Sequence, residues 1–203
     1  ERIVVGMIGM GKMCWGHLGD MLNRKEVQVA GVCDVESLRL EKCRKRVEDT
    51  YSERFGKTYR GCAVYRDFRE LVSRDDVDAV LIATPTHWHA PIAVEAAKYG
   101  KDIYCEKPLA FTAHEACAIA EAARRYNVVF QTGSQQRSDF KFRFACELVR
   151  NGRIGTLKHI HVNCGGPPKS CYLPAEPVPE TLDWDMWLGP SPVRPYHSQI
   201  CPM

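Results

Sequence analysis

Apolar residues in the N-terminal part of the chain fall into short continuous runs, separated by longer stretches with helical periodicity. The runs predict buried strands at residues 2–8, 27–33, 63–65, 77–83, 103–105 and 128–131. The stretches between them predict helices at residues 15–23, 36–49, 68–73 and 91–99, and Thr112 with Glu115 predicts a capped helix that follows. Strands that alternate with helices in this way are typical of an α/β fold with a doubly wound parallel sheet.

The pattern changes after Gly133. Residues 140–151 have the spacing of an amphipathic helix, and residues 157–164 alternate between apolar and polar side chains as a half-buried strand does. Residues 165–195 are rich in proline and glycine and contain one apolar island, at 182–190. The chain past Gly133 therefore predicts a second structural unit with a helix and a strand of its own.

These patterns divide the chain near Thr132. We expect a complete doubly wound domain at residues 1–132 and the start of an incomplete second domain, α/β or α+β in class, at residues 133–203. One strand cannot bury the apolar face of a sheet by itself. We therefore expect a fragment, a shortened chain, or a chain that another copy completes.

Two glycines follow the first predicted strand directly, in the stretch Gly9-Met10-Gly11, and a helix-compatible stretch comes next. In the dinucleotide-binding fingerprint the first glycine forms a tight turn, and the second lets the backbone approach a pyrophosphate. The helix N-terminus then offers free N–H groups and the positive end of a dipole to the phosphates. Cys14 stands at the position of the third glycine, with Gly16 close by. A glycine-rich turn in an unrelated fold is the alternative.

Asp34 ends the second predicted strand, 25 residues after Gly9. The fingerprint expects an acidic residue about 20 residues on, where its carboxylate binds the ribose hydroxyls. Because a carboxylate there repels a 2′-phosphate, Asp34 favours NAD over NADP as the cofactor. The alternative is a surface aspartate that caps the next helix.

The stretch from Cys105 to Leu109 places the carboxylate of Glu106 beside the ammonium group of Lys107, where Pro108 ends the fifth predicted strand. The carboxyl end of a strand in an open parallel sheet is where ligands bind. We expect Lys107 to face a nicotinamide cofactor and a polar substrate, and Glu106 to orient the lysine and keep it charged. An ion pair that only closes the strand end is the alternative.

Composition and charge argue against several classes of function. The 203 residues carry a net charge of +3, which is too small to indicate nucleic-acid binding. No apolar run approaches the roughly 20 residues that span a membrane. The first residues show no signal-peptide pattern, so we expect a cytoplasmic protein, and the missing initiator Met leaves a removed leader for export open.

Ten cysteines occur, but none forms a Cys-x-x-Cys pair, and no Cys/His spacing resembles a zinc site. His87 and His89 lie two apart but lack a third ligand at a useful spacing, so we expect no metal. Five cysteines in apolar periodic segments predict buried free thiols in a reducing compartment: Cys33, Cys105, Cys117, Cys146 and Cys164. A disulfide framework is the alternative.

Several motifs occur together in one order along the chain. They are Gly9-Met10-Gly11 with His17, residues 83–89 (Ala-Thr-Pro-Thr-His-Trp-His), 105–109 (Cys-Glu-Lys-Pro-Leu), 133–137 (Gly-Ser-Gln-Gln-Arg), 151–155 (Asn-Gly-Arg-Ile-Gly) and 182–190 around Trp184 and Trp187. With these motifs the chain resembles the Gfo/Idh/MocA oxidoreductase family, named for glucose-fructose oxidoreductase and inositol dehydrogenase. The resemblance covers nearly the whole chain.

The resemblance implies an N-terminal Rossmann domain that binds NAD or NADP. It also implies a C-terminal α/β substrate domain, whose open, mostly antiparallel sheet often forms the interface of a homo-oligomer. The implied reaction is hydride transfer between the nicotinamide and a sugar, cyclitol or related polyol.

The same resemblance assigns residues to this site. Those implied to bind the cofactor are Gly9, Gly11, Lys12 and Met13 at the pyrophosphate, Asp34 at the adenosine ribose, Thr84, Pro85, His87 and His89 beside the cofactor, and Gln136 and Arg137 near the nicotinamide. Glu106 and Lys107 are implied to lie at the nicotinamide and the substrate as the catalytic pair.

Members of the family are usually much longer than this chain. The Asp and His that commonly complete the catalytic set with the lysine would lie in a part of the substrate domain that this sequence lacks, so no residue here is assigned to them. Two alternatives to a dehydrogenase stay open. One is a glycosidase that uses tightly held NAD to oxidise a sugar transiently, and the other is a non-catalytic module that binds NAD or a sugar.

Overall fold

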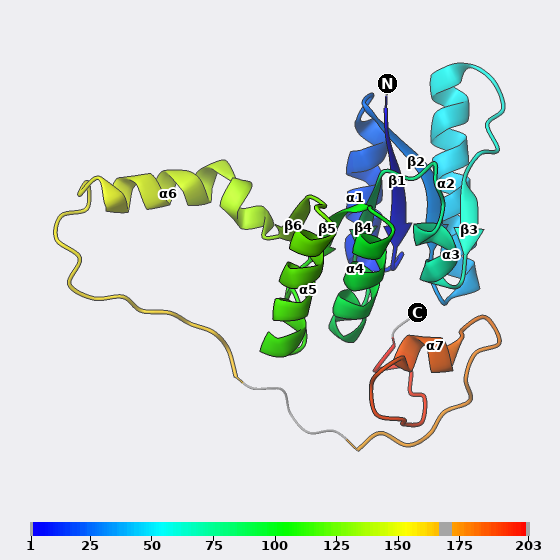
Figure 1. The fold of residues 1–203 in the computed structure, drawn as a ribbon. Helices are drawn as coiled ribbons and strands as arrows, with labels where there is room; N and C mark the ends of the chain where they lie inside the picture. Colours follow the sequence, from blue (N-terminus) through cyan, green and yellow to red (C-terminus); the bar gives the residue numbers. More distant parts are fainter. Residues whose placement is uncertain (1, 167–171, 202–203) are drawn as a thin grey trace.

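A computed structural model describes residues 2–166 and 172–201 and contains a six-stranded sheet flanked by helices (Figure 1). The strands are β1 (Ile3–Ile8), β2 (Val27–Cys33), β3 (Ala63–Tyr65), β4 (Ala79–Ile82), β5 (Asp102–Glu106) and β6 (Phe130–Gly133). All neighbouring strands are parallel, and their order across the sheet is β3-β2-β1-β4-β5-β6. This is the doubly wound Rossmann order. The α/β fold class that the sequence predicts is confirmed.

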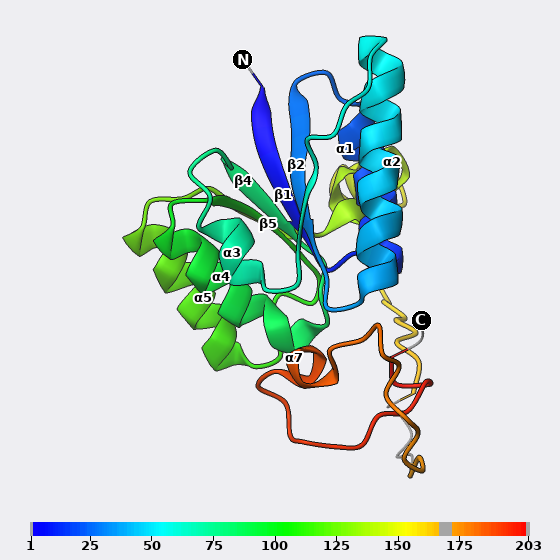
Figure 2. The ribbon, with the colours of Figure 1, turned by 90° about the vertical axis from the view of Figure 1, so that its right-hand side faces the viewer.

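Helices cover both faces of the sheet. The helices of the described residues are α1 (Lys12–Asn23), α2 (Ser37–Phe55), α3 (Phe68–Val72), α4 (His89–Lys98), α5 (Ala113–Arg125), α6 (Phe140–Arg150) and α7 (Trp184–Leu188), with the short 3-10 helices η1 (Thr86–Trp88) and η2 (Gln135–Ser138). Figure 2 shows α1 and α2 on one face and α3, α4 and α5 on the other. Helix α6 projects away from the sheet, whereas α7 lies below the ends of the central strands in both views.

Two apolar cores result, one on each face. Leu18, Val29 and Tyr51 are buried beneath α1 and α2, and Leu71 and Ile92 are buried on the opposite face. Strands that are covered on both faces have apolar side chains in continuous runs. This explains why each predicted strand of the sheet agrees with the observed one to within two residues at either end.

The central strands end level with one another. Ile8 at the end of β1 pairs with Cys33 of β2 and with Ile82 of β4. The loops after these three strands therefore leave the sheet at the same edge. In an open parallel sheet this carboxyl edge binds ligands at the point where the strand order reverses, which here lies between β1 and β4.

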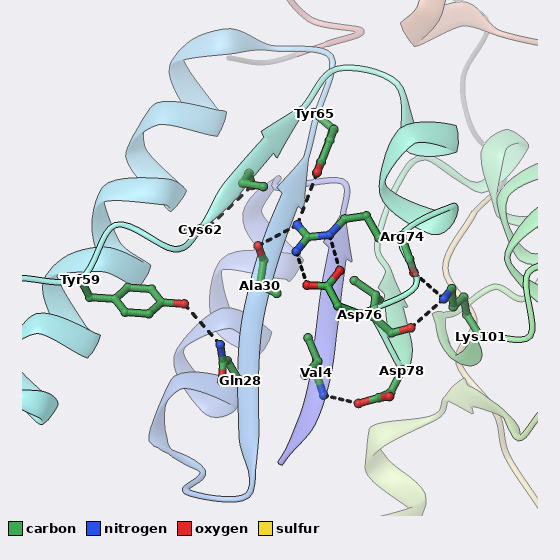
Figure 3. Close-up of polar contacts among 12 residues, drawn as sticks. Val4, Gln28, Ala30, Tyr59, Cys62, Tyr65, Arg74, Asp76, Asp78 and Lys101 are labelled. Atoms are coloured by element: carbon green, nitrogen blue, oxygen red, sulfur yellow. Dashed lines mark hydrogen bonds and ion pairs between the residues drawn. The ribbon is translucent and has the colours of Figure 1, made fainter. Parts of the chain in front are cut away.

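Charged groups near α3 serve the structure of the sheet (Figure 3). Arg74 pairs with both carboxylate oxygens of Asp76, at 2.8 and 2.6 Å, and donates to the carbonyl of Ala30 at 3.2 Å. Lys101 is 7% exposed, and its ammonium group donates to the carbonyls of Arg74 and Val77 at 2.6 and 2.8 Å. These bonds fasten the connection between α3 and β4 to β2 and to the start of β5.

The strand predicted at residues 157–164 is wrong. The backbone there forms no ladder, and Leu157, Ile160 and Val162 are 53%, 69% and 69% exposed. A strand is stable only beside partners that share a buried face, and no strand within residues 2–166 or 172–201 pairs with this stretch. The helix predicted just before it is confirmed, with its last residue at Arg150.

The cysteines divide into two groups. All nine that the structure describes are free thiols, and Cys33 and Cys105 are buried as the sequence predicts. Cys117, Cys146 and Cys164 are exposed, so the prediction of burial is wrong for these three. Cys117 lies on the outer side of α5, Cys146 lies on the projecting α6, and Cys164 is the last residue of the stretch that lacks strand partners.

Candidate cofactor site

The turn after β1 requires its first glycine. Gly9 has a φ of +86°, in the left-handed region, and a Cβ atom there would lie 2.6 Å from the backbone nitrogen of Thr84. The chain that leaves β1 therefore passes directly against the chain that leaves β4. Helix α1 begins immediately afterwards, with Gly11 as its N-cap.

The N-terminus of α1 is open. Gly11 has no side chain that could cap the helix, no side-chain cap hydrogen bond is present, and the first turn has no acidic residue. Lys12 and Met13 begin the helix, and N–H groups in a first turn have no partner within the helix. Together with the positive end of the helix dipole, these groups form a site for an anion such as pyrophosphate.

Cys14 takes the packing position of the missing third glycine. Its side chain is fully buried between α1 and the sheet, and its Sγ lies 3.7 Å from Sδ of Met10. Burial raises the pKa of the Cys14 thiol, so the group stays neutral. Gly16 is exposed, with open space where its Cβ would lie, so it does not replace that glycine.

Asp34 joins the turn after β1 to the start of α2. It is 7% exposed, its Oδ2 accepts from the N–H of Met10 at 2.6 Å, and its Oδ1 accepts from the N–H of Glu36 at 2.9 Å. Burial raises the pKa of the Asp34 carboxyl, while the N–H of Glu36 and the Arg39 guanidinium oppose that shift. Because a carboxylate oxygen accepts more than one hydrogen bond, both oxygens keep capacity for a ligand. The side chain that caps α2 is that of Glu36.

A cavity of about 360 Å³ lies at the carboxyl edge of β1, β2 and β4. Seven of the residues predicted to bind the cofactor line it: Gly9, Gly11, Lys12, Met13, Asp34, Thr84 and Pro85. Six others do not line it: His87, His89, Glu106, Lys107, Gln136 and Arg137. The cavity thus brings together the residues predicted for the pyrophosphate and the adenosine ribose, while the predicted nicotinamide residues lie outside it.

The chemistry of these cavity residues suits a dinucleotide. The hydroxyl of Thr84 is buried and has no hydrogen-bond partner in the described part of the chain. Buried polar groups in native proteins are nearly always paired, so this hydroxyl is available to a polar group of a ligand. The open N-terminus of α1, the close approach at Gly9 and the carboxylate of Asp34 supply the other groups that a pyrophosphate and a ribose require.

The two histidines after β4 join the segments that surround the cavity. Nε2 of His87 lies 2.9 Å from the carbonyl oxygen of Trp187. His89 is 1% exposed, and its two ring nitrogens lie 2.9 Å from the carbonyl oxygens of Thr84 and Pro108. His89 therefore ties the loop after β4 to the loop after β5, and His87 contacts the C-terminal part of the chain.

Glu106 does not form the ion pair with Lys107 that the sequence predicts. It is 4% exposed, and its Oε1 lies 2.7 Å from Nε2 of His17 and also accepts from the side-chain amide of Gln135. Its Oε2 accepts from the backbone N–H of Lys107 at 3.0 Å. The ammonium group of Lys107 is exposed, and no ion pair to it occurs within the described residues. The carboxylate turns inward because α1 and η2 both offer it partners.

Sequence reasoning missed the roles of His17 and Gln135. His17 lies on α1, five residues after Lys12, and Gln135 begins η2 directly after β6. The sequence signal for Gln135 is its place after a strand end, because all six strand ends meet at one edge of the sheet. Gln136 and Arg137, the predicted neighbours, are exposed on the same short helix.

Sequence reasoning also missed one wall of the cavity. It is formed by the C-terminal segment, defined here as residues 172–201. Met186, Trp187, Ile200 and Cys201 of this segment line the cavity opposite the strand ends. The apolar island of the sequence contains the first two of these residues, but its pattern does not show what it packs against.

Within residues 2–166 and 172–201, the structure contains neither a cluster of metal-ligating side chains nor a membrane-spanning helix. No group of three or more His, Cys, Asp or Glu side chains there could hold a metal ion. No helix there is long and apolar enough to cross a bilayer.

Two protein-family models match the chain. The model described as "Oxidoreductase family, NAD-binding Rossmann fold", named GFO_IDH_MocA, matches residues 3–134. A second model, described as "Oxidoreductase family, C-terminal alpha/beta domain", matches residues 168–201. The first of these spans more than half of the chain.

Individual proteins are similar as well. "Uncharacterized oxidoreductase YrbE" of Bacillus subtilis is 30% identical over 82% of this chain and 46% of its own length. "Alpha-N-acetylgalactosaminidase" of Shewanella oneidensis is 30% identical over 78% of this chain and 34% of its own. The crystal structure of myo-inositol 2-dehydrogenase from Lactobacillus plantarum has a TM-score of 0.64 and 25% identity, over 76% of this chain and 43% of that one. The chain thus spans less than half the length of these relatives.

Proposed function

Because this chain belongs to the Gfo/Idh/MocA oxidoreductase family, we propose that it is the cofactor-binding part of an NAD-dependent enzyme. The reaction is hydride transfer between the nicotinamide and a sugar, cyclitol or related polyol. The similar inositol dehydrogenase from Lactobacillus plantarum supports this class of substrate.

The cavity at the carboxyl edge carries the proposal. It lies where the strand order reverses between β1 and β4, and the turn of Gly9 and Gly11 with the open end of α1 borders it. The N–H groups of α1 bind the pyrophosphate, and the carboxylate of Asp34 accepts hydrogen bonds from the adenosine ribose. A 2′-phosphate would meet that same carboxylate, so NAD is the favoured cofactor.

Lys107 is the proposed catalytic residue. When bound, the nicotinamide supplies the hydride chemistry. The exposed ammonium group of Lys107 can donate a hydrogen bond to the substrate oxygen and stabilise the negative charge that develops there, and the deprotonated amine can take the hydroxyl proton. Glu106 supports this role through the backbone, because its carboxylate fixes the N–H of Lys107 and is itself held by His17 and Gln135.

Replacement of Lys107 tests the catalytic role. In the full gene product, Lys107→Ala is expected to lower kcat by about 100-fold or more, because one positioned acid–base group contributes that much. Affinity for NAD, measured by titration calorimetry, is expected to stay near that of the wild type, since Lys107 does not line the cavity. Lys98→Ala, at an exposed lysine on α4, is the matched control. Full turnover by a Lys107→Ala protein that binds NAD normally would refute the role.

A second candidate is a glycosidase that oxidises its sugar only transiently. The 30% identity to an α-N-acetylgalactosaminidase favours it. Both enzymes use the same cavity and lysine, but the glycosidase retains NAD and shows no net redox change. Glycoside cleavage without any net change in the near-ultraviolet absorbance of reduced nicotinamide would identify it. Cofactor binding without turnover on either class of substrate would identify a binding module.

The domain division and the assembly belong to the same proposal. The boundary near Thr132 is supported by the first family model, which ends at residue 134, while the second model matches only residues after it, from 168 to 201. The second domain, at residues 133–203, then contributes to substrate binding and to a homo-oligomer interface. A cytoplasmic enzyme is consistent with the free thiols of the described cysteines.

A further inference from the structure

The C-terminal segment is joined to the loop that follows Asp34. The N–H of Asp183 donates to the carbonyl of Val35 at 3.0 Å, and the N–H of Ser37 donates to the carbonyl of Thr181 at 3.0 Å. These two bonds surround an antiparallel bridge between Glu36 and Leu182. The backbone of the segment is thus hydrogen-bonded directly to the loop after the proposed ribose-binding carboxylate.

Side chains fasten the same segment at two further places. Arg66 donates to the carbonyls of Val35 and Thr181 at 3.1 and 3.4 Å. On the other side of the cavity, the indole N–H of Trp88 donates to the carbonyl of Met186 at 2.9 Å. Gly189 lies so close to Trp88 that a Cβ atom would be 2.3 Å from the indole ring. Helix α7 is therefore held from both the β2 and the β4 side of the cavity.

Trp187 is fixed in the cavity wall. Its ring stacks on Trp184 at a centroid distance of 4.7 Å and an interplanar angle of 14°, and His87 lies edge-on to it at 5.6 Å. Trp184 is 8% exposed within a small apolar cluster of the segment. Trp187 remains partly exposed and lines the cavity beside Met186. An aromatic ring that is held in this way, beside a thioether that also lines the cavity, suits a flat, apolar ligand group.

The neighbouring residues identify that group. The cavity contains Asp34, which is the proposed ribose-binding residue, and excludes Glu106 and Lys107 at the proposed nicotinamide end. A purine ring attached to that ribose is flat, and bases stack on aromatic side chains. We propose that the adenine half of the dinucleotide binds between the strand ends and the C-terminal segment, with Trp187 and Met186 as its wall. This inference rests on the proposed function.

One consequence is that binding of the cofactor and docking of the C-terminal segment are coupled. If the segment forms part of the adenosine site, then nucleotide binding must stabilise its docking by the same factor by which docking improves binding. ADP-ribose, which contains the adenosine half without the nicotinamide, should be sufficient for this effect. Nicotinamide mononucleotide, which lacks the adenosine, should not produce it.

Calorimetry on the purified chain tests the site. Trp187→Ala is expected to raise the Kd for NAD and for ADP-ribose by about 10-fold, the effect of removing one stacking ring. Trp187→Phe should restore most of this affinity, and binding of nicotinamide mononucleotide should not change. Val193→Ala, at a side chain of the same segment that is 94% exposed and outside the cavity, is the matched control.

Hydrogen exchange on the wild-type chain keeps the test independent of how a variant folds. ADP-ribose is expected to slow amide exchange in residues 181–188. The inference would be overturned if Trp187→Ala and Met186→Ala both bound ADP-ribose as tightly as the wild type does, and if ADP-ribose left the amide exchange of residues 181–188 in the wild type unchanged. NAD binding by the wild type would still support the proposed function in that case. A wild-type chain that binds neither NAD nor ADP-ribose would instead overturn the proposed function itself.

Discussion

Asp34 is almost completely buried, with 7% of its surface exposed, and it nevertheless lines the cavity. Its two oxygens hold the N–H groups of Met10 and Glu36, which fixes the turn after β1 against the start of α2. Burial raises its pKa, so the folded state holds this proton more tightly than the unfolded state does. The carboxyl group therefore makes the stability of the fold depend on pH.

The direction of this dependence follows from proton linkage. The unfolded chain has an ordinary aspartate pKa of about 3.9. The contribution of Asp34 to stability is fully present below that value and is lost as the pH rises through the raised pKa. Relative to Asp34→Asn, the wild type should lose up to about 1.4 kcal/mol of unfolding free energy per pH unit in this window. Urea denaturation at fixed ionic strength measures it.

A matched variant separates this effect from the loss of one negative charge. Asp75→Asn changes an exposed carboxylate and serves as the control. If the difference between the wild type and Asp34→Asn stayed constant or grew as the pH rose, the buried carboxyl would not be the source of the dependence.

Glu106 shows where sequence reasoning reached its limit at the residue scale. The sequence placed it correctly at the end of β5, because an apolar run followed by proline marks that end locally. Its partner His17 lies 89 residues away in sequence, on helix α1. No local pattern states which way a carboxylate turns, so the adjacent Lys107 was the only partner that the sequence suggested.

At the scale of helices and strands, capping residues and glycines near an element's end determine where that element begins or ends, and a boundary that carries such a signal can be predicted from the sequence. The capping box of α5 is present with both of its hydrogen bonds, from Thr112 and Glu115. Helix α1 begins at Lys12, earlier than predicted, because Gly11 gives no side-chain capping signal. Helix α2 runs on to Phe55, where Gly56 in the left-handed conformation ends it. The strand predicted at residues 157–164 does not form, because an alternation of apolar and polar side chains does not by itself supply a partner strand.

Lys101 connects two of these elements through one buried ammonium group. Its donors hold the carbonyls of Arg74 and Val77, so it fastens the loop before β4 to the start of β5. Lys101→Met keeps the aliphatic stem but leaves both carbonyls without that donor, and buried unpaired groups cost about 1–3 kcal/mol. We expect a loss of that size in the free energy of unfolding, measured by chemical denaturation, with NAD affinity unchanged.

The control is a lysine with an exposed partner. Lys98 pairs with Glu95 at 2.8 Å with side chains that are 49% and 28% exposed. Lys98→Met should therefore cost less than about 1 kcal/mol. A Lys101→Met protein as stable as the Lys98→Met protein would show that the buried ammonium group does not hold these elements together.

At the scale of the whole molecule, the two parts of the chain beyond β6 behave differently. The C-terminal segment lies at the carboxyl edge of the sheet, whereas α6 projects from the body (Figure 1). The apolar side chains of α6 do not pack on the sheet: Phe140, Phe142 and Phe144 are 66%, 56% and 48% exposed. Contiguous exposed apolar surface in a protein marks a contact surface or a tendency to associate.

We therefore expect this chain to self-associate with rising concentration and to bind a hydrophobic dye. Light scattering after size exclusion measures the first property, and dye fluorescence measures the second. The double replacement Phe142→Ser and Phe144→Ser should reduce both, because it removes two of the exposed rings on α6. Phe111→Ser, at a ring that is 75% exposed on the loop before α5, is the matched control. A monomer at high concentration with no dye binding would mean that α6 folds back onto a surface of its own chain.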